Sequence, residues 1–472
     1  MTEPTSLLPP RVAVLGFARS GQALASALLD RGIEVSVGDR RPEGELGQAV
    51  SEMRRRGARF FLGDFMPDSL LEGAGWLGVS PGVPASAPVP KAARSRGIPV
   101  LAELEIAWRI AQKEVQGENR WVAVTGTNGK STTTAWIADL LRRAGRPVAL
   151  AGNIGVPVSA FLGERSPRDF VCEVSSFQLE TVSRFRADVA VVTNVTPDHL
   201  DRHGSFEAYA RAKARVFENQ RPGDASVINI DDDGSAGLAP GGGRRIPFSR
   251  HGVPEGGAGV AEGWLVSEAS GQRRQLLPVH DLALPGTHNV ENALAAVAAA
   301  DCLGAPLAAM REGLLRFAGL PHRTEIVAEG GGVTWVNDSK GTNVDATAKA
   351  LEGFPDGRVV LILGGRDKKG DFRRLAPMAR RRARLVLTIG EAAASIERAL
   401  AGTTVIERSD TMEKAVERAA AEARHGDTVL LSPACASFDQ YANFEERGEH
   451  FARLARRAAE RVRRGLEQDD GA

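Results

Sequence analysis

The sequence predicts an α/β protein of three domains with mostly parallel sheets, and three observations support this prediction. Short apolar runs alternate with amphipathic or alanine-rich stretches along the chain, which is typical of strands that alternate with helices. The length of 472 residues suits about three domains of roughly 150 residues each. Hydrophobic residues make up 43% of the chain, which is enough to give each domain a core.

The first domain, expected over residues 1–115, begins with a strand, a glycine-containing turn at 16–21 and a helix. Its predicted strands are residues 11–15, 33–37 and 76–79. The turn lacks the middle glycine of the G-x-G-x-x-G pattern, which argues against a dehydrogenase. Asp39 nevertheless follows the turn at a spacing that suits a ribose contact. A packed strand–helix connection without a ligand explains the turn equally well.

The central domain is expected over residues 116–318 and the third over residues 319–472. The predicted strands of these two domains are residues 121–124, 170–174, 189–193, 225–229, 333–337, 359–363, 385–389 and 428–431. Glycine-rich residues 231–280 are predicted to form an insertion or a meander, and residues 289–303 an alanine-rich helix. The last ten residues are predicted to fray.

Composition excludes several classes of function. The chain has 60 basic and 59 acidic side chains, so its net charge of +1 gives no electrostatic reason to expect a nucleic acid or a membrane surface as partner. The sequence has no apolar run of about 18 residues and no secretory leader pattern. Its three cysteines have no paired spacing, which indicates a reducing compartment without disulfides or a zinc site. We therefore expect a cytoplasmic protein.

The strongest local signal is the stretch Gly126-Thr127-Asn128-Gly129-Lys130-Ser131-Thr132, which a strand enters and a helix leaves. In such a turn, backbone N–H groups and the helix N-terminus bind phosphates. Lys130 is expected to reach the β- and γ-phosphates of a nucleotide, and Ser131 carries a hydroxyl suited to Mg²⁺. The full Walker pattern has another glycine where Val124 stands, so this is a shortened variant. The alternative is a plain strand–helix turn with a surface lysine.

Three further signals follow the phosphate-binding stretch. Glu173 ends an apolar run and is a candidate Mg²⁺ ligand, although a strand-end surface charge is an equal alternative. Four ionisable residues crowd one turn after the next strand, and spacing does not say which of them faces a site: Asp198, His199, Asp201 and His203. Lys213 lies on a predicted helix and, on pattern alone, is a solvated surface lysine.

Late in the chain, three polar loops each follow a predicted strand. They are residues 337–343, 364–372 and 432–448. Because open α/β sheets bind ligands at the carboxyl ends of their strands, these loops together predict the rim of a site. Each loop by itself is equally well explained as a turn.

Together these stretches resemble the Mur ligase family of ATP-dependent amide-forming enzymes. The stretches that carry the resemblance are GTNGKST, GNIG at 152–155, EVSSFQLE, TNVTPDHLDRH, HNVENALAA, GLPHR and NDSKGTN. LGGRDKKGDF and LSPACASFDQYANFEERG resemble the members that add D-glutamate. The resemblance implies a Rossmann-like N-terminal domain that binds a uridine nucleotide, a central P-loop ATPase-type domain and a C-terminal Rossmann-like domain that binds the amino acid.

The resemblance also implies roles at matching positions. Lys130, Glu173, His199 and Lys213 are the expected catalytic residues. Expected ATP contacts are Gly126, Thr127, Asn128, Gly129, Lys130, Ser131, Thr132, Asn289, Asn292, Arg323 and Asp338. Expected contacts to the uridine-containing substrate are Arg19, Ser20, Asp39, Arg40, Ser80, Gly82 and Asn153. Expected D-glutamate contacts are Lys340, Thr342, Lys368, Ser437, Phe438 and Phe444. Two Mg²⁺ ions are expected on Ser131, Glu173, His199 and a carbamylated Lys213.

The implied reaction joins D-glutamate to UDP-N-acetylmuramoyl-L-alanine through an acyl phosphate, in peptidoglycan precursor synthesis, by a monomer that binds no nucleic acid and does not insert into a membrane. Three rivals remain: a sister ligase or folylpolyglutamate-type synthetase, a P-loop kinase or NTPase, and an inactive nucleotide-binding scaffold. A panel of amino acids and acceptors separates the ligases from one another. Phosphate release that does not depend on an amino acid would indicate an NTPase.

Overall fold

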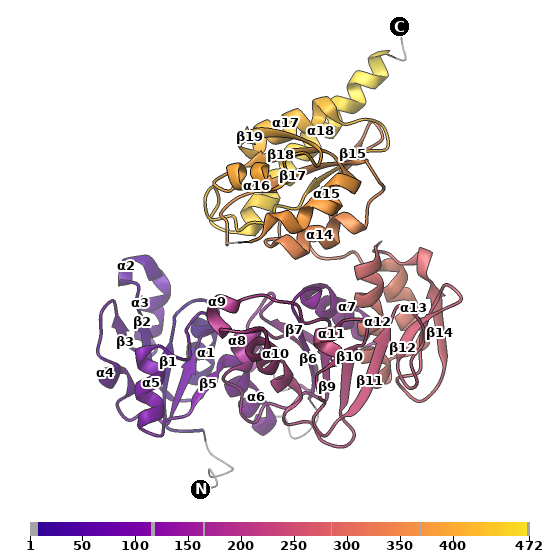
Figure 1. The fold of residues 1–472 in the computed structure, drawn as a ribbon. Helices are drawn as coiled ribbons and strands as arrows, with labels where there is room; N and C mark the ends of the chain where they lie inside the picture. The colour runs from indigo at the N-terminus through magenta and orange to yellow at the C-terminus, as the bar shows by residue number, and fades with distance from the viewer. Residues whose placement is uncertain (1–7, 115–118, 164–165, 285, 369, 470–472) are drawn as a thin grey trace. The chain divides into compact units, whose positions relative to one another are not determined.

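The computed structural model describes residues 8–114, 119–163, 166–284, 286–368 and 370–469, which form three separate sheets (Figure 1). Most neighbouring strands are parallel, so the predicted three-domain α/β fold is confirmed. The chain divides into two compact units. Unit 1 comprises Met1–Ala283 and Glu291–Phe317 and contains the first two sheets, and unit 2 comprises Leu284–Val290 and Ala318–Ala472 and contains the third. The domain boundaries at 115/116 and 318/319 stay predictions.

The first sheet has five parallel strands in the order β3-β2-β1-β4-β5. They are β1 Arg11–Leu15, β2 Glu34–Asp39, β3 Arg59–Leu62, β4 Trp76–Val79 and β5 Val100–Ala102. The helices are α1 Arg19–Leu29, α2 Glu43–Leu46, α3 Gln48–Arg55, α4 Pro67–Leu71, α5 Pro88–Ser95 and α6 Glu103–Glu114. Leu24 and Leu28 of α1 belong to one core and Leu70 and Leu71 of α4 to another, so helices cover both faces of the sheet.

The second sheet has nine strands in the order β14-β13-β12-β11-β10-β9-β6-β8-β7. The strands are β6 Arg120–Thr125, β7 Val148–Gly152, β8 Asp169–Glu173, β9 Val189–Val192, β10 Ala225–Asn229, β11 Arg244–Ser249, β12 Ala258–Ala261, β13 Trp264–Ser267 and β14 Arg274–Pro278. Its helices are α7 Lys130–Arg143, α8 Ser176–Leu179, α9 Leu200–His203, α10 Phe206–Ala214, α11 Asp233–Ala236, α12 Thr287–Cys302 and α13 Leu307–Arg316. Pairing is parallel from β7 to β12 and antiparallel from β12 to β14, so residues 231–280 contain the predicted meander.

The third sheet has six strands in the order β15-β16-β20-β17-β18-β19, of which only the β15–β16 pair is antiparallel. The strands are β15 Glu325–Gly330, β16 Val333–Asn337, β17 Val359–Gly364, β18 Ala383–Ile389, β19 Val405–Asp410 and β20 Thr428–Leu431. The helices are α14 Val344–Glu352, α15 Ala376–Arg382, α16 Ala393–Ala399, α17 Met412–Glu422 and α18 Phe444–Asp469. Helices α17 and α18 contribute to one core and α14, α15 and α16 to the other, on opposite faces of the sheet (Figure 1).

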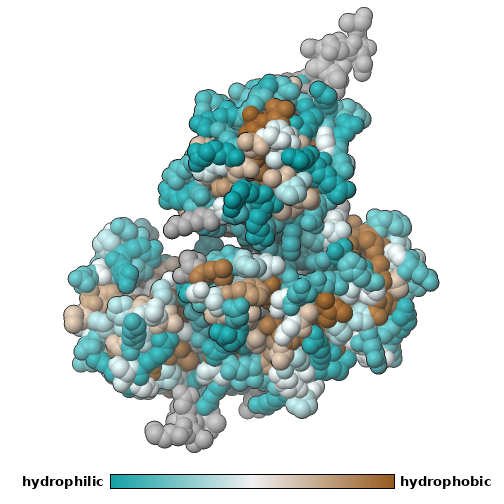
Figure 2. Space-filling view, in the orientation of Figure 1, coloured by the Kyte–Doolittle hydropathy of each residue, from teal (hydrophilic) through white to brown (hydrophobic). Residues whose placement is uncertain are grey.

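The prediction that the last ten residues fray was wrong for most of them, since α18 continues to Asp469. Its composition explains this, because arginine, glutamate, leucine and alanine all favour helix. Within the described residues, no helix is long and apolar enough to cross a membrane. The face shown in Figure 2 is mostly hydrophilic, with separate hydrophobic patches.

A buried glutamate attaches the last helix of the first domain to the central domain. Glu105 of α6 has no exposed surface and accepts hydrogen bonds from the backbone N–H groups of residues 183–185 at 2.8–3.0 Å. Arg109 pairs with the same carboxylate at 2.7 Å. A buried carboxylate without such partners would be strongly unfavourable. Glu105 therefore fixes α6 against residues 183–185 within unit 1.

Candidate active site

The predicted phosphate-binding stretch is a turn between β6 and α7, and β6 lies between β9 and β8 inside the second sheet. Lys130 Nζ donates to the carbonyl oxygens of Gly126 at 2.8 Å and Thr127 at 2.7 Å, so the lysine folds back over the turn. Residues directly after β9 support the turn: Asn128 N–H donates to Asn194 Oδ1 at 2.9 Å, and Thr193 Oγ1 donates to Asn128 O at 2.6 Å. The sequence pattern did not indicate these supporting roles.

Two glycines of this turn are required by its geometry. Gly126 has φ of 146° and Gly129 has φ of 80°, which side chains other than glycine rarely adopt. A Cβ on Gly126 would lie 2.0 Å from Thr193 Oγ1, and a Cβ on Gly129 would lie 2.3 Å from Asn292 Oδ1. Both glycines therefore allow close packing as well as the turn.

An oxygen-rich chain of contacts lies beside the turn. Glu173 ends β8 and is only 2% exposed, so its interpretation as a strand-end surface charge was wrong. One of its carboxylate oxygens accepts a hydrogen bond from the fully buried hydroxyl of Ser131, and the other accepts from Asn153 Nδ2 at 2.7 Å. The structure thus brings together three side chains that are separated in the sequence.

Lys213 is 1% exposed, so its interpretation as a solvated surface lysine was also wrong. Its Nζ donates to Gly126 O at 2.6 Å, which is the same oxygen that Lys130 contacts, and lies 4.5 Å from the centre of the Tyr209 ring. Burial, together with the charge of Lys130, lowers the pKa of Lys213 well below its ordinary value, although Asp198 and Glu173 act in the opposite direction. Lowering the pKa of a buried amine makes its neutral, nucleophilic form easier to reach.

The two histidines of the acidic turn have different surroundings. His199 has φ of 51°, and its side chain is 47% exposed and packs against Phe177 with ring centres 4.9 Å apart. The side chain of His203 is 4% exposed and its Nε2 lies 3.0 Å from Ser176 Oγ. Burial lowers the pKa of His203. His199 is therefore the more exposed of the two, while the side chain of Asp201 lies outside the described residues.

In the first domain, Asp39 is held by its own neighbours. It accepts hydrogen bonds from Phe17 N–H at 2.7 Å and from the Arg41 guanidinium at 2.9 Å. Burial raises the pKa of Asp39, but the hydrogen bonds from Arg41 and Phe17 outweigh it and leave the pKa below its ordinary value. Arg41 was not singled out from the sequence, whereas the predicted contacts Arg19 and Arg40 are exposed.

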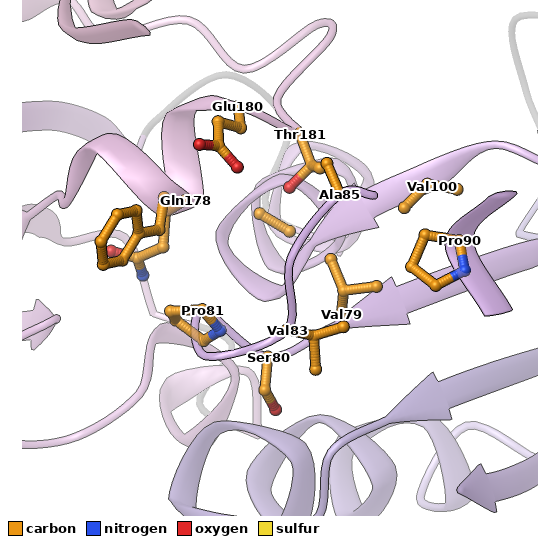
Figure 3. Close-up of a pocket in the computed structure, with 12 residues that line it drawn as sticks. Val79, Ser80, Pro81, Val83, Ala85, Pro90, Val100, Gln178, Glu180 and Thr181 are labelled. Carbon is orange, nitrogen blue, oxygen red and sulfur yellow. The ribbon is translucent and has the colours of Figure 1, made fainter. Parts of the chain in front are cut away.

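Ser80 and Gly82 lie in the loop after β4, where Ser80 Oγ donates to Gly16 O at 2.9 Å. This loop lines a small pocket with residues of the central domain, and Figure 3 shows Ser80 and Pro81 on one side and Gln178, Glu180 and Thr181 on the other. The loop is also bound to the central domain by Arg202, whose guanidinium donates to Pro81 O at 3.0 Å. Unit 1 therefore holds the loop close to α8.

In unit 2, Asp338 is a buried carboxylate at the end of β16. It accepts hydrogen bonds from Ser432 Oγ at 2.7 Å and from Thr324 N–H at 3.2 Å. Burial raises its pKa to about 6, although Ser432 and the charge of Arg323 act in the opposite direction.

Asn289 is 5% exposed, and its neighbour His288 was not singled out from the sequence. Burial, with the charges of Lys349 and Arg323, lowers the pKa of His288 to about 4.

The six predicted amino-acid contacts lie in loops that follow adjacent strands β16, β20 and β17, or at the start of α18. Lys368 Nζ donates to Thr342 Oγ1 at 3.0 Å, and Lys340 Nζ lies 5.2 Å from the centre of the Phe444 ring. Ser437 is 2% exposed, whereas Phe438 is 61% exposed. The structure thus gathers two lysines and a hydroxyl, which suits an anionic ligand.

The residues beside the phosphate-binding turn fit Mg²⁺. Among the described residues, no three histidine, cysteine or acidic side chains cluster as a complete metal site. Mg²⁺ does not need one, because it usually binds one or two protein carboxylates and completes its shell with water and substrate phosphates. Ser131 and Glu173 offer such hard oxygen ligands next to the turn.

Three family descriptions match consecutive parts of the chain: "Mur ligase MurD-like, N-terminal domain" at residues 10–102, "Mur ligase middle domain" at 124–300 and "Mur ligase, glutamate ligase domain" at 322–435. A UDP-N-acetylmuramoylalanine–D-glutamate ligase from Anaeromyxobacter dehalogenans is 46% identical over 94% of this chain and 97% of the relative. A ligase of the same name from Acidobacterium capsulatum is 43% identical over 94% of this chain and 95% of the relative.

Solved structures agree on the fold. The UDP-N-acetylmuramate-alanine ligase of Thermotoga maritima superposes with a TM-score of 0.58 at 19% identity, covering 94% of this chain and 98% of that one. The MurF ligase of the same organism, in complex with ADP, superposes with a TM-score of 0.60 at 17% identity, covering 91% and 95%. Three family domains in order and identities above 40% over nine-tenths of the length show that this chain belongs to the Mur ligase family.

Proposed function

We propose that this chain is an ATP-dependent ligase that adds D-glutamate to UDP-N-acetylmuramoyl-L-alanine through an acyl-phosphate intermediate, releasing ADP and phosphate. The observation that carries the proposal is the set formed around one glycine turn by the half-buried Lys130 and the buried Ser131, Glu173 and Lys213. Such a set suits transfer of a phosphoryl group. The acceptor and the amino acid are inferred from relatives that carry this name at 41–46% identity.

In the first step, the substrate carboxylate attacks the γ-phosphorus of ATP; an O–P bond forms and the bond to ADP breaks. The N–H groups of residues 126–132 and the ammonium of Lys130 bind the phosphates and offset their negative charge. To do so, Lys130 exchanges its carbonyl contacts with Gly126 and Thr127 for phosphate oxygens. Ser131 and Glu173 would hold Mg²⁺, which would supply further positive charge next to the transferring group.

Lys213 is the proposed site of carbamylation. Its amine is buried and its pKa is lowered, so it loses its proton more readily than an ordinary lysine, and the neutral amine is the form that adds CO₂. Carbamylation releases one proton and leaves an anion in place of a second positive charge beside Lys130. That anion would offer oxygen ligands for a second Mg²⁺, with His199 as a further ligand. Asn153, which orients Glu173 at 2.7 Å, is a proposed contact of the substrate carboxylate.

In the second step, the neutral amine of D-glutamate attacks the acyl carbon; the C–N bond forms, phosphate leaves and the amine loses a proton. We assign D-glutamate binding to Lys340, Thr342, Lys368, Ser437, Phe438 and Phe444. The two lysines match the two carboxylates of this amino acid in charge. Asn289, Asn292, Arg323 and Asp338 are assigned to the nucleotide, and Arg19, Ser20, Asp39, Arg40, Ser80 and Gly82 to the uridine-containing substrate.

The proposed setting is peptidoglycan precursor synthesis in the cytoplasm, by a monomer with domains 1–115, 116–318 and 319–472. Phosphate release is measured with ATP, Mg²⁺ and UDP-N-acetylmuramoyl-L-alanine, with and without D-glutamate, and the amide product is identified by mass spectrometry. L-Glutamate, L-alanine and meso-diaminopimelate serve as competing amino acids. Phosphate release independent of an amino acid, or preference for one of the competitors, contradicts the proposal.

A further inference from the structure

Arg447 is a fully buried cation in unit 2 that the reaction above does not use. It lies in the first turn of α18 and is 1% exposed. It is not paired with an acid: within the part of the chain that the structure describes, no carboxylate oxygen lies within 4.0 Å of its guanidinium. Burial lowers the pKa of Arg447 to about 10, so it stays protonated at neutral pH.

The guanidinium is bound by backbone carbonyls and one hydroxyl instead. Its Nε donates to Ser339 Oγ at 3.0 Å and its Nη2 to Ser339 O at 2.8 Å. Its Nη1 donates to Cys435 O at 3.1 Å and lies 3.5 Å from Gly364 O. Ser339 Oγ in turn donates to Phe444 O at 2.8 Å, so Ser339 is bonded to the first residue of α18 as well as to Arg447.

These contacts join the ends of three adjacent strands. Ser339 follows β16, Gly364 ends β17 and Cys435 follows β20, and β20 lies between the other two in the sheet. Each contact is close in sequence to proposed amino-acid ligands. Ser339 precedes Lys340 and Thr342, Gly364 precedes Lys368, Cys435 precedes Ser437 and Phe438, and Phe444 lies one helical turn before Arg447.

Only arginine suits this position. Its planar fork presents five donors in fixed directions, whereas lysine presents three from a single atom and cannot reach three separate loops. The carbonyl oxygens would lack partners in a buried place if the guanidinium were removed. The local backbone is also tightly packed, since a Cβ on Gly365 would lie 2.2 Å from Ala436 O and 3.1 Å from Arg447 Nη1.

We propose that Arg447 is a positioning residue that holds the three strand-end loops in register and thereby sets the geometry of the amino-acid site. This inference rests on the proposed function for the identity of the ligand, D-glutamate. The role of Arg447 in holding the loops does not depend on the proposed function. All three guanidinium nitrogens of Arg447 are bound to the loops, and the residue is only 1% exposed, so it acts through the loops rather than by touching the amino acid.

The kinetic test compares Arg447→Lys with Arg453→Lys, a matched change at an exposed position on the same helix. We expect Arg447→Lys to raise the KM for D-glutamate about tenfold or more, with the KM values for ATP and the muramoyl nucleotide changed less than about twofold. Ser339→Ala should act in the same direction but more weakly. Parallel increases in all three KM values, or no change in any, would overturn the proposal.

A second test needs no substrate. Amide hydrogen exchange is compared in the three loops, where Gly341 N–H donates to Asp338 O, Arg366 N–H to Ala436 O and Ala434 N–H to Gly341 O. Arg447→Lys should accelerate exchange in these loops and leave β18 unchanged; equal exchange everywhere refutes the role. If wild-type protein makes no product with D-glutamate, the proposed function fails, while this measurement still decides the role of Arg447.

Free guanidinium supplies a third readout. Arg447→Ala leaves a space lined by the carbonyls of Ser339, Gly364 and Cys435, and millimolar guanidinium should lower the KM for D-glutamate toward the wild-type value. A merely space-filling role predicts no such recovery. If Arg447→Ala does not fold, the lysine and Ser339→Ala variants carry the kinetic test.

Discussion

Replacing Lys213 with methionine is expected to make the protein more stable at neutral pH while it abolishes activity. Methionine retains the apolar stem and removes the amine. In the wild type, Lys130 Nζ and Lys213 Nζ contact the same oxygen, Gly126 O, at 2.8 and 2.6 Å. The two distances add to 5.4 Å, so the nitrogens are no further apart than that.

Two unit charges at this separation repel by about 3 kcal/mol at an effective dielectric constant of about 20. Burial and this repulsion keep the folded-state pKa of Lys213 below 10.5, the ordinary value. The unfolded chain therefore binds one proton more than the folded chain over the range between these two pKa values. Stability of the wild type therefore falls as pH decreases from 10.5, and Lys213→Met does not share this loss.

The assay is urea unfolding in CO₂-free buffer from pH 7 to pH 10, with both proteins at each pH. The advantage of Lys213→Met should shrink as pH rises. A variant less stable than wild type at pH 7, or a difference that does not change with pH, would refute the reasoning. In ¹³C-bicarbonate, wild type should show a carbamate resonance that the variant lacks, and the inactive Lys213→Ala variant should regain partial activity with short carboxylic acids.

Three further predictions concern neighbouring groups. Gly129→Ala should weaken ATP binding about tenfold or more by calorimetry, because its Cβ would lie 2.3 Å from Asn292 Oδ1. Gly145→Ala is the control. Gly145 has a similar φ of 77°, but its added Cβ would meet nothing within 4 Å, so this variant has the backbone strain without the contact and should leave ATP affinity unchanged. Wild type should lose up to about 3 kcal/mol of unfolding free energy as pH rises from 4 to 6, because the pKa of Asp338 is raised from 3.8 to about 6 in the folded protein. Asp338→Asn should not show this loss. Urea midpoints of the two proteins that change equally with pH would count against the prediction. Glu173→Gln should raise the Mg²⁺ concentration for half-maximal activity about tenfold, and an unchanged Mg²⁺ titration would remove Glu173 from the metal site.

The sequence predicted central strands well and edge strands poorly. Runs such as 225–229 and 428–431 match β10 and β20, because strands buried on both faces are continuous apolar runs. Outside residues 231–280, where only an insertion or a meander was predicted, the strands that were not predicted are β3, β5, β7, β15 and β19, all of which lie at sheet edges. Edge strands are short or half exposed, so their sequences mix polar and apolar residues and resemble loops.

In the site, residues in a local motif were predictable and residues brought in by packing were not. The turn at 126–132 has its glycines, lysine and hydroxyl at fixed spacings that phosphate binding requires. Lys213 and Arg447 lie on helices among other charged residues, where nothing in the pattern indicates burial. Resemblance to a family identified Lys213, but only the contacts at the strand ends identified Arg447.

The carboxylate of Glu105 has a practical consequence for chimeras between relatives. A crossover placed in the stretch between α6 and β6 would separate Glu105 from the N–H groups of residues 183–185 that it satisfies. If the second parent has a different backbone at residues 183–185, the carboxylate of Glu105 would be buried without these hydrogen bonds. Grafts that carry the first sheet and α6 should therefore take the 183–185 turn from the same parent, so that its N–H groups still match the carboxylate.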